Sequence, residues 1–458
     1  MSHYLGVLAM PLKHVEPEVK FVLIAFVQHF GLVDGESRTV EARAGLLGLP
    51  TRVVASAMAQ LVDSGWLVKQ AMSMPTCSGR PNHSYQVQAD LAAMLEATEG
   101  PTFIHERLIK RLIAGPVIRA VGPDDSGDGG GAVQSTKLID EFDKPVPPGR
   151  RGNLSLANRL LLVALLSRAD AFGVVSDLGN VELVQLTGLA PATLRQRLRR
   201  LMDLGFIRSY VAGVSCSILS RKVMSTYFLN LGHRQLTQTP GFQVFSHWTF
   251  EDNGRRFQHH GDRLRNDVRA AKKTLVNGSM TPRPVLRFLW QQRPEVFAVL
   301  QLLLSRYASY LLSHHWSNLG TPTVHVNDEL RKMICSDLRK PAPSLPLDAE
   351  RGERDWQEII EHFRELALEL AEEYKSRFEQ APWILFELLD MRILPVPDGR
   401  GYEAISLLVR GGSDQCCLIV GQDGIGGERA FDHEADITLD DRYLSGLLTG
   451  PKDKVFKR

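Results

Sequence analysis

Arginine and glutamine side chains recur at helical spacing in the segment from Pro191 to Leu204. An arginine can bind guanine in a fork geometry and a glutamine can do the same with adenine, so a helix carrying them could discriminate base pairs in a major groove. An apolar stripe that would pack inward is formed by Leu194, Leu198, Leu201 and Met202. The side chains left facing outward are Thr193, Arg195, Gln196, Arg199 and Arg200.

A second segment, from Thr51 to Ser64, has the same apolar spacing but a weaker reading surface. Its outward side chains are Arg52, Ser56 and Gln60, set among alanines. Downstream, Arg80 and His83 could enter a minor groove or contact phosphates. Two interpretations stay open for this segment: it binds DNA, mainly through Arg80 and His83, or it packs against protein.

The two segments belong to an internal repeat with an offset of 140 residues, at which Gly48 meets Gly188 and Gly65 meets Gly205 without a gap. Each copy predicts three helices, with a glycine turn before the third and a glycine after it. The first copy predicts helices at about Glu16 to Phe30, Val40 to Leu47 and Thr51 to Ser64. The second predicts them at about Ser155 to Ala171, Asn180 to Thr187 and Pro191 to Leu204.

A β-hairpin is expected after the third helix of each copy, because an aromatic-aliphatic pair follows the terminal glycine. In the first copy it pairs residues 66–68 with residues 85–87. In the second copy it pairs residues 206–211 with residues 214–218 and turns at Ala212-Gly213.

The run Gly65-Trp66-Leu67, followed by Gly79-Arg80-Pro81 and Tyr85, resembles the recognition-helix end and wing of bacterial winged-helix regulators related to the MarR group. The whole first copy is also similar to helix-turn-helix domains of phage and plasmid replication or regulatory proteins. The resemblance covers roughly residues 12–95 and 153–230. It implies a winged helix-turn-helix fold in both copies and double-stranded DNA as the partner.

The expected fold class is mainly α with small β wings: two winged helix-turn-helix domains plus a C-terminal α+β domain. A stretch rich in Gly, Asp and Pro separates the copies and predicts a flexible linker. The r.m.s. distance between the ends of such a linker is roughly 30 Å. We therefore expect two tethered modules able to occupy one side of a duplex. The domains are residues 1–115, linker 116–152, 153–232 and a mainly helical region 233–458 with terminal strands.

The C-terminal region begins with the densest basic segment of the chain, which also contains His259 and His260. Its cations are Arg255, Arg256, Arg263, Arg265, Arg269, Lys272 and Lys273. Its interpretation as a phosphate contact stands beside that of a solvated helix face. Helices are predicted at Glu295 to Ser313 and Arg354 to Phe378, and strands at Ala404 to Val409 and Cys416 to Val420. The stripe of the second helix favours core packing over a subunit contact, and roles in binding DNA, a protein partner or a second copy stay open.

The composition describes a globular chain of 458 residues with 44% hydrophobic and 23% charged residues and a net charge of +2. We expect a cytoplasmic protein with no membrane segment, because neither a signal sequence nor a long apolar run is found. The five cysteines lack zinc spacing, so no metal and no cofactor are expected. Any affinity for nucleic acid must come from local basic surfaces.

Three functions would use such modules: that of a transcription regulator, as in a mobile genetic element, that of a plasmid or phage replication initiator, and that of a site-specific nuclease. A nuclease needs acids and a lysine around Mg²⁺, whereas Pro397-Asp398 is followed by Glu403-Ala404-Ile405 with no lysine. The residues therefore favour a DNA-binding protein without enzymatic activity. Of the three functions, we expect transcription regulation, with replication initiation as the alternative and the nuclease as the lesser alternative.

Overall fold

The chain is described by a computed structural model that is mainly helical and contains small β-sheets. The description covers residues 3–11, 15–71, 83–97, 103–114, 154–233, 235–236, 243–248, 259–273, 281–321, 328–342, 349–379, 389–395, 404–410, 417–421, 428–432 and 434–448. The expected linker at 116–152, like Arg80, Arg255, Arg256 and Pro397-Asp398, lies outside these residues.

The chain divides into two compact units. Unit 1 comprises residues 1–171, 178–206 and 235–238, and unit 2 comprises residues 172–177, 207–234 and 239–458. The division runs through the second copy of the repeat, because its helices belong to unit 1 and its strands to unit 2.

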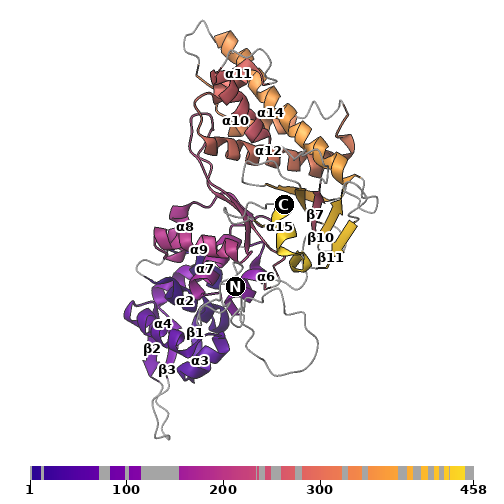
Figure 1. The fold of residues 1–458 in the computed structure, drawn as a ribbon. Coiled ribbons are helices and arrows are strands. Elements are labelled where there is room, and N and C mark those ends of the chain that lie inside the picture. Colours follow the sequence, from indigo (N-terminus) through magenta and orange to yellow (C-terminus); the bar gives the residue numbers. More distant parts are fainter. Residues whose placement is uncertain are drawn as a thin grey trace. The chain divides into compact units, whose positions relative to one another are not determined.

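The first copy of the repeat contains three helices and a three-stranded antiparallel sheet (Figure 1). The helices are α2 (Pro17–Phe30), α3 (Val40–Leu47) and α4 (Thr51–Asp63). The strands, in sheet order, are β1 (Val33–Arg38), β3 (His83–Val87) and β2 (Leu67–Ala71). Leu67 pairs with Val87 and Lys69 with Tyr85, which confirms the hairpin predicted for this copy. Strand β1 was not predicted, because its polar sequence Val-Asp-Gly-Glu-Ser-Arg has no apolar alternation.

The second copy repeats this order with α7 (Leu156–Leu166), α8 (Asn180–Thr187) and α9 (Pro191–Asp203). Its strands, in sheet order, are β4 (Val174–Val175), β6 (Thr226–Leu229) and β5 (Ile207–Val211). The bounds of α8 and α9 follow those of α3 and α4 by 140 residues at both ends, so the repeat seen in the sequence is a repeat of structure. Helix α7 is shorter than predicted and ends before Ser167.

The hairpin predicted for the second copy is wrong in its second strand. Strand β5 pairs with Thr226–Leu229, not with residues 214–218. A side chain at Gly213 would lie 2.6 Å from the backbone of Met224, and Val214 forms a bridge with Val223. The glycine therefore permits a close approach of two backbone segments instead of a tight turn, and a longer loop, residues 212–225, joins the strands.

The helices of the two copies pack directly against each other in unit 1, and this corrects the expectation of independent tethered modules. Helix α7 contacts both α2 and α6 (Glu106–Ala114). Arg159 of α7 donates from Nε to the carbonyl oxygen of Leu112 at 2.8 Å, and its guanidinium lies 4.8 Å from the ring centroid of Phe21 in α2. Sequence periodicity could not predict this contact, because it does not show which distant backbone carbonyl an arginine within an apolar helix will bind. Two further helices, α1 (His3–Ala9) and α5 (Ala89–Ala97), contact each other in the same unit.

Unit 2 combines a helical layer with a five-stranded mixed sheet. The helices are α10 (His260–Lys273), α11 (Arg283–Leu289), α12 (Pro294–His315), α13 (Asp328–Asp337), α14 (Ala349–Phe378) and α15 (Leu439–Leu444). The sheet order is β11 (Glu428–Phe431), β10 (Cys417–Gly421), β7 (Gln243–Trp248), β9 (Ala404–Arg410) and β8 (Asp390–Leu394), with β10 and β7 parallel. Short 3-10 turns lie at Trp316–Asn318 and Glu434–Asp436.

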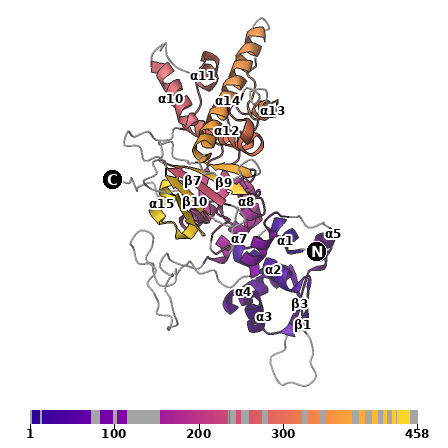
Figure 2. The ribbon, with the colours of Figure 1, turned by 90° about the vertical axis from the view of Figure 1, so that its right-hand side faces the viewer.

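Helix α12 is the central core element of unit 2. It contacts α10, α13, α14 and strand β8, and it lies between α10 and α11 on one side and the sheet on the other (Figures 1 and 2). The segment Pro294–Asn318 is long and apolar enough to cross a membrane, and it is mostly buried within the unit. The core interpretation of α14 is confirmed, since its stripe is buried: Trp356, Ile360, Phe363, Ala367, Leu370 and Tyr374.

Candidate nucleic-acid interface

Helix α9 presents a polar row opposite a buried apolar row. Leu194, Leu198 and Leu201 are at most 8% exposed, while Met202 is only partly buried. Four side chains predicted to face outward are exposed, namely Arg195, Gln196, Arg199 and Arg200, and Thr193 is partly buried. The spacing Arg195/Arg199 and Gln196/Arg200 places them in adjacent rows on one helix surface.

Arg197 holds α9 against the first helix of its own copy. Its Nη1 donates to Ser155 Oγ at 2.7 Å and to Asn158 Oδ1 at 3.3 Å. The same Ser155 hydroxyl accepts from the Asn158 backbone and caps α7. Arg197 is therefore a positioning residue, which fits its place beside the buried row, three residues from Leu194.

The entry to α9 is a tight turn at Gly188, whose φ of 71° is in the left-handed region. A Cβ atom there would lie 2.7 Å from the carbonyl oxygen of Val15, so the turn packs against the residues that precede α2. Pro191 occupies the first turn of α9, where its missing N–H costs nothing. The start of the helix is thus fixed from both copies of the repeat.

Helix α4 presents a similar surface with less charge. Val54, Ala57, Met58 and Leu61 are buried, and Arg52, Ser56 and Gln60 are exposed as predicted. Arg52 is the one cation of the predicted outward set on α4, compared with three on α9. The electrostatic attraction for a polyanion is therefore stronger at α9.

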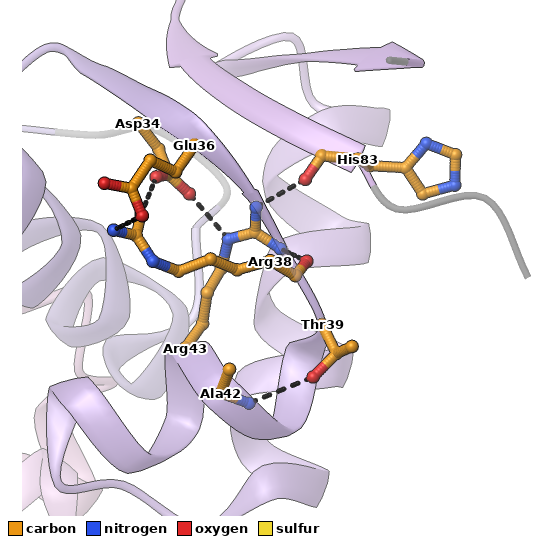
Figure 3. A network of polar contacts seen from close by, with 7 residues as sticks. All are labelled: Asp34, Glu36, Arg38, Thr39, Ala42, Arg43 and His83. Carbon is orange, nitrogen blue, oxygen red and sulfur yellow. Dashed lines mark hydrogen bonds and ion pairs between the residues drawn. The ribbon is translucent and has the colours of Figure 1, made fainter. Parts of the chain in front are cut away.

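A polar network fixes the sheet of the first copy to α3 (Figure 3). The guanidinium of Arg43, 1% exposed, donates from Nε to Asp34 Oδ2 at 2.7 Å and also contacts the carbonyl oxygens of Arg38 and His83. Asp34 accepts in addition from Arg38, and the Arg43 guanidinium lies 4.7 Å from the Tyr85 ring centroid. Neither Asp34 nor Arg43 was singled out from the sequence, where nothing marks them as partners.

His83 lies at the start of β3, and its ring points away from this network (Figure 3). Desolvation and the nearby cations Lys69 and Arg43 lower the pKa of its imidazole. A neutral imidazole would act on a phosphate or base as a hydrogen-bonding group without a charge. Arg80, the other residue predicted for this strand pair, lies outside the described residues.

The sheet of the second copy is buried in unit 2. Arg208 and Ser209 in β5 are 0% exposed, and all of β6 is buried. Arg208 forms a buried ion pair with Glu434, with Nη1 to Oε1 at 2.6 Å and Nη2 to Oε2 at 2.5 Å. The second copy therefore has no free hairpin of the kind expected from the sequence.

The basic segment predicted in the C-terminal region contributes partly paired cations. Arg263 on α10 donates to Glu369 on α14 at 2.9 Å, and Arg265 lies 4.0 Å from Asp262. His260 is 7% exposed, and burial, with the charge of Arg263, lowers its pKa to about 4. Arg263 and Arg265 are thus half-buried and paired with acids of unit 2, whereas Arg269 and Lys272 on the same helix are exposed.

Within the described ranges, no three His, Cys, Asp or Glu side chains are grouped as the ligands of a metal ion would be. The exposed polar row of α9 remains the most concentrated set of predicted contacts. Compared with known proteins, the chain matches no protein-family model and no curated protein by sequence.

Proposed function

We propose that this chain is a sequence-specific double-stranded DNA-binding protein that regulates transcription, with two winged helix-turn-helix modules fused in tandem. The observation that carries the proposal is the exposed row of Arg195, Gln196, Arg199 and Arg200 on α9. These side chain types form bidentate hydrogen bonds with guanine and adenine edges, each worth about 1–3 kcal/mol of discrimination.

The scaffold around α9 supports this role. A reading helix must present its side chains in a fixed orientation, because a misplaced donor loses its base contact. Arg197 ties α9 to α7, Gly188 seats its entry turn against Val15, and Arg159 ties α7 to α6. The row is therefore carried by a packed unit and not by a mobile arm.

The two copies contribute unequally to this function. Helix α9 supplies base recognition, and α4, with one arginine in its outward set, supplies weaker contacts through Arg52, Ser56 and Gln60. Direct packing of α7 on α2 fixes the helices of the second copy relative to those of the first. Helices α4 and α9 would therefore meet one duplex as a single body.

Selection from a random duplex library tests the proposal with the full chain. We expect a defined motif to be enriched by the wild type and lost by the double variant R195A/R199A. The matched control R107A/R111A removes two exposed arginines, also four residues apart, from α6 of the same unit, and should enrich the wild-type motif. No enrichment by a folded wild-type protein, or an unchanged motif for R195A/R199A, would contradict the proposal.

A further inference from the structure

The loop between β5 and β6 is docked on the end of α13 by backbone pairing. Leu219 forms a bridge with Leu338, and both side chains are buried. The Ser220 N–H donates to the Asp337 carbonyl at 2.8 Å, and the Arg339 N–H donates to the Ile218 carbonyl at 2.8 Å. Residues 218–220 are thus held like a short strand against residues 337–339, all within unit 2.

This pairing gathers cations from two segments more than 100 residues apart. Arg221 and Lys222 follow the paired residues directly and are exposed. Arg339 is exposed as well, and its Nη2 donates to the Ser220 carbonyl at 3.2 Å, which holds its guanidinium beside the loop. We call these three residues, Arg221, Lys222 and Arg339, the basic tip.

Asp337, the described acid nearest to Arg339 in the chain, is engaged elsewhere. Asp337 is 6% exposed, and its carboxylate accepts from the Tyr307 hydroxyl at 2.7 Å and pairs with Arg306. Glu353 pairs with Lys340, the residue after the basic tip. The three cations of the basic tip therefore add up to a local positive charge on a chain whose net charge is only +2.

We propose that the basic tip is a second nucleic-acid contact, which binds the phosphate backbone of duplex DNA without reading its sequence. Closely spaced, exposed arginine and lysine side chains complement a row of phosphates, and the docked loop gives them a fixed position. The proposal rests on the proposed function only for its choice of duplex DNA as the polyanion. The chemistry differs from that of α9, because phosphate contacts position a protein on the duplex and carry no base information.

The salt dependence of binding to a random-sequence duplex tests this assignment in the full chain. Each phosphate contact that is lost lowers the slope of log K against log salt by about 0.9. The variant R221Q/K222Q/R339Q should reduce the slope by about 2 to 3 and weaken binding to all duplexes equally. The charge-conserving variant R221K/R339K should keep a slope close to that of the wild type.

The matched control is R283Q/R293Q/R351Q, which removes three exposed arginines from other helices and turns of unit 2. An equal loss of slope in this control, or an unchanged slope in R221Q/K222Q/R339Q, would overturn the proposal. So would charge-dependent binding of the basic tip to vesicles of phosphatidylserine in place of DNA. The two proposals fail separately, because loss of motif discrimination reports on α9, whereas a uniform loss of affinity and slope reports on the basic tip.

Discussion

Arg159 in α7 donates its Nε hydrogen to the carbonyl oxygen of Leu112 in α6, and both residues are 1% exposed. Arg159 also donates to the Ile113 carbonyl at 3.1 Å. One guanidinium therefore supplies hydrogen bonds to two carbonyl oxygens in the last turn of α6, which lies between the two copies of the repeat in the sequence. Burial lowers the pKa of Arg159 to about 10, which leaves it charged at neutral pH. Together with the packing of α7 on α2, this contact holds the helices of the two copies against each other.

Substitution of Arg159 by alanine should therefore destabilise unit 1 strongly. Two buried carbonyl oxygens would lose a charged donor, at a cost of about 3 kcal/mol. Urea unfolding, with hydrogen exchange of the amides of unit 1 as the readout, measures the loss of unfolding free energy. The control is R168A, which removes the ion pair between Arg168 and Glu182, whose side chains are 44% and 39% exposed, respectively. Because this pair lies at the surface, R168A should cost less than about 1 kcal/mol of unfolding free energy. Equal losses for both variants would refute the role given to Arg159.

The buried pair Arg208–Glu434 should show strong coupling in unit 2. Removal of one partner, as in E434A, leaves an uncompensated buried charge and should cost about 3–5 kcal/mol. The double variant R208M/E434L should recover most of that loss, because no charge remains buried. A double-mutant cycle from chemical unfolding gives the coupling energy, and additive effects of the two substitutions would show that the pair is not coupled.

Two glycines of positive φ should respond differently to alanine. At Gly65, with φ of 74°, nothing described lies within 4 Å of an added Cβ, so G65A should cost about 1 kcal/mol from backbone strain alone. At Gly188 the Cβ would also meet the Val15 carbonyl at 2.7 Å, so G188A should cost clearly more. Thermal unfolding of the two variants checks the order, and a smaller loss for G188A would contradict the close approach.

Lys20 should make the stability of unit 1 depend on pH. It is 1% exposed and donates to the carbonyl oxygens of Leu8 and Met10 at 3.2 and 2.5 Å, and burial lowers its pKa from 10.5 to about 7. Between these values the unfolded chain binds more protons than the folded one, so the wild type should gain stability as the pH rises.

The comparison of the wild type with K20M isolates this effect. The stability of the wild type relative to K20M should rise between about pH 7 and pH 10, by at most about 1.4 kcal/mol per pH unit. Thermal unfolding of both proteins across this range measures the difference. A difference that stays constant with pH would mean that Lys20 does not titrate in this window.

The helices of the repeat were predictable from sequence, because glycine turns and apolar spacing are local signals. The bounds of α3, α8, α4 and α9 agree with the prediction to within one residue. The second strand of the later hairpin was not predictable, because residues 214–218 are apolar enough for a strand, while pairing of 218–220 with 337–339 depends on a helix more than 100 residues away.

The outward row of α9 was predictable for the same local reason, since it follows from the position of Leu194, Leu198 and Leu201. Arg197 differs, because its role depends on Ser155 and Asn158 in another helix. The packing of α7 on α2 and α6 was hidden as well, because the residues between the copies read as a flexible linker and gave no sign of contact across them. Local patterns thus indicated the elements, and tertiary contacts decided which cations are positioned for binding.

The central claim, that α9 reads base edges, is tested most directly by the base preferences of single α9 variants. Binding of R195A, Q196A and R199A to the selected motif and to each single-base change of it should show relaxed preference at one or two positions per variant, with a loss of about 1–3 kcal/mol at each. R52A should leave those positions unchanged. Unaltered preferences at every position in all three α9 variants, in proteins that remain folded, would contradict the account.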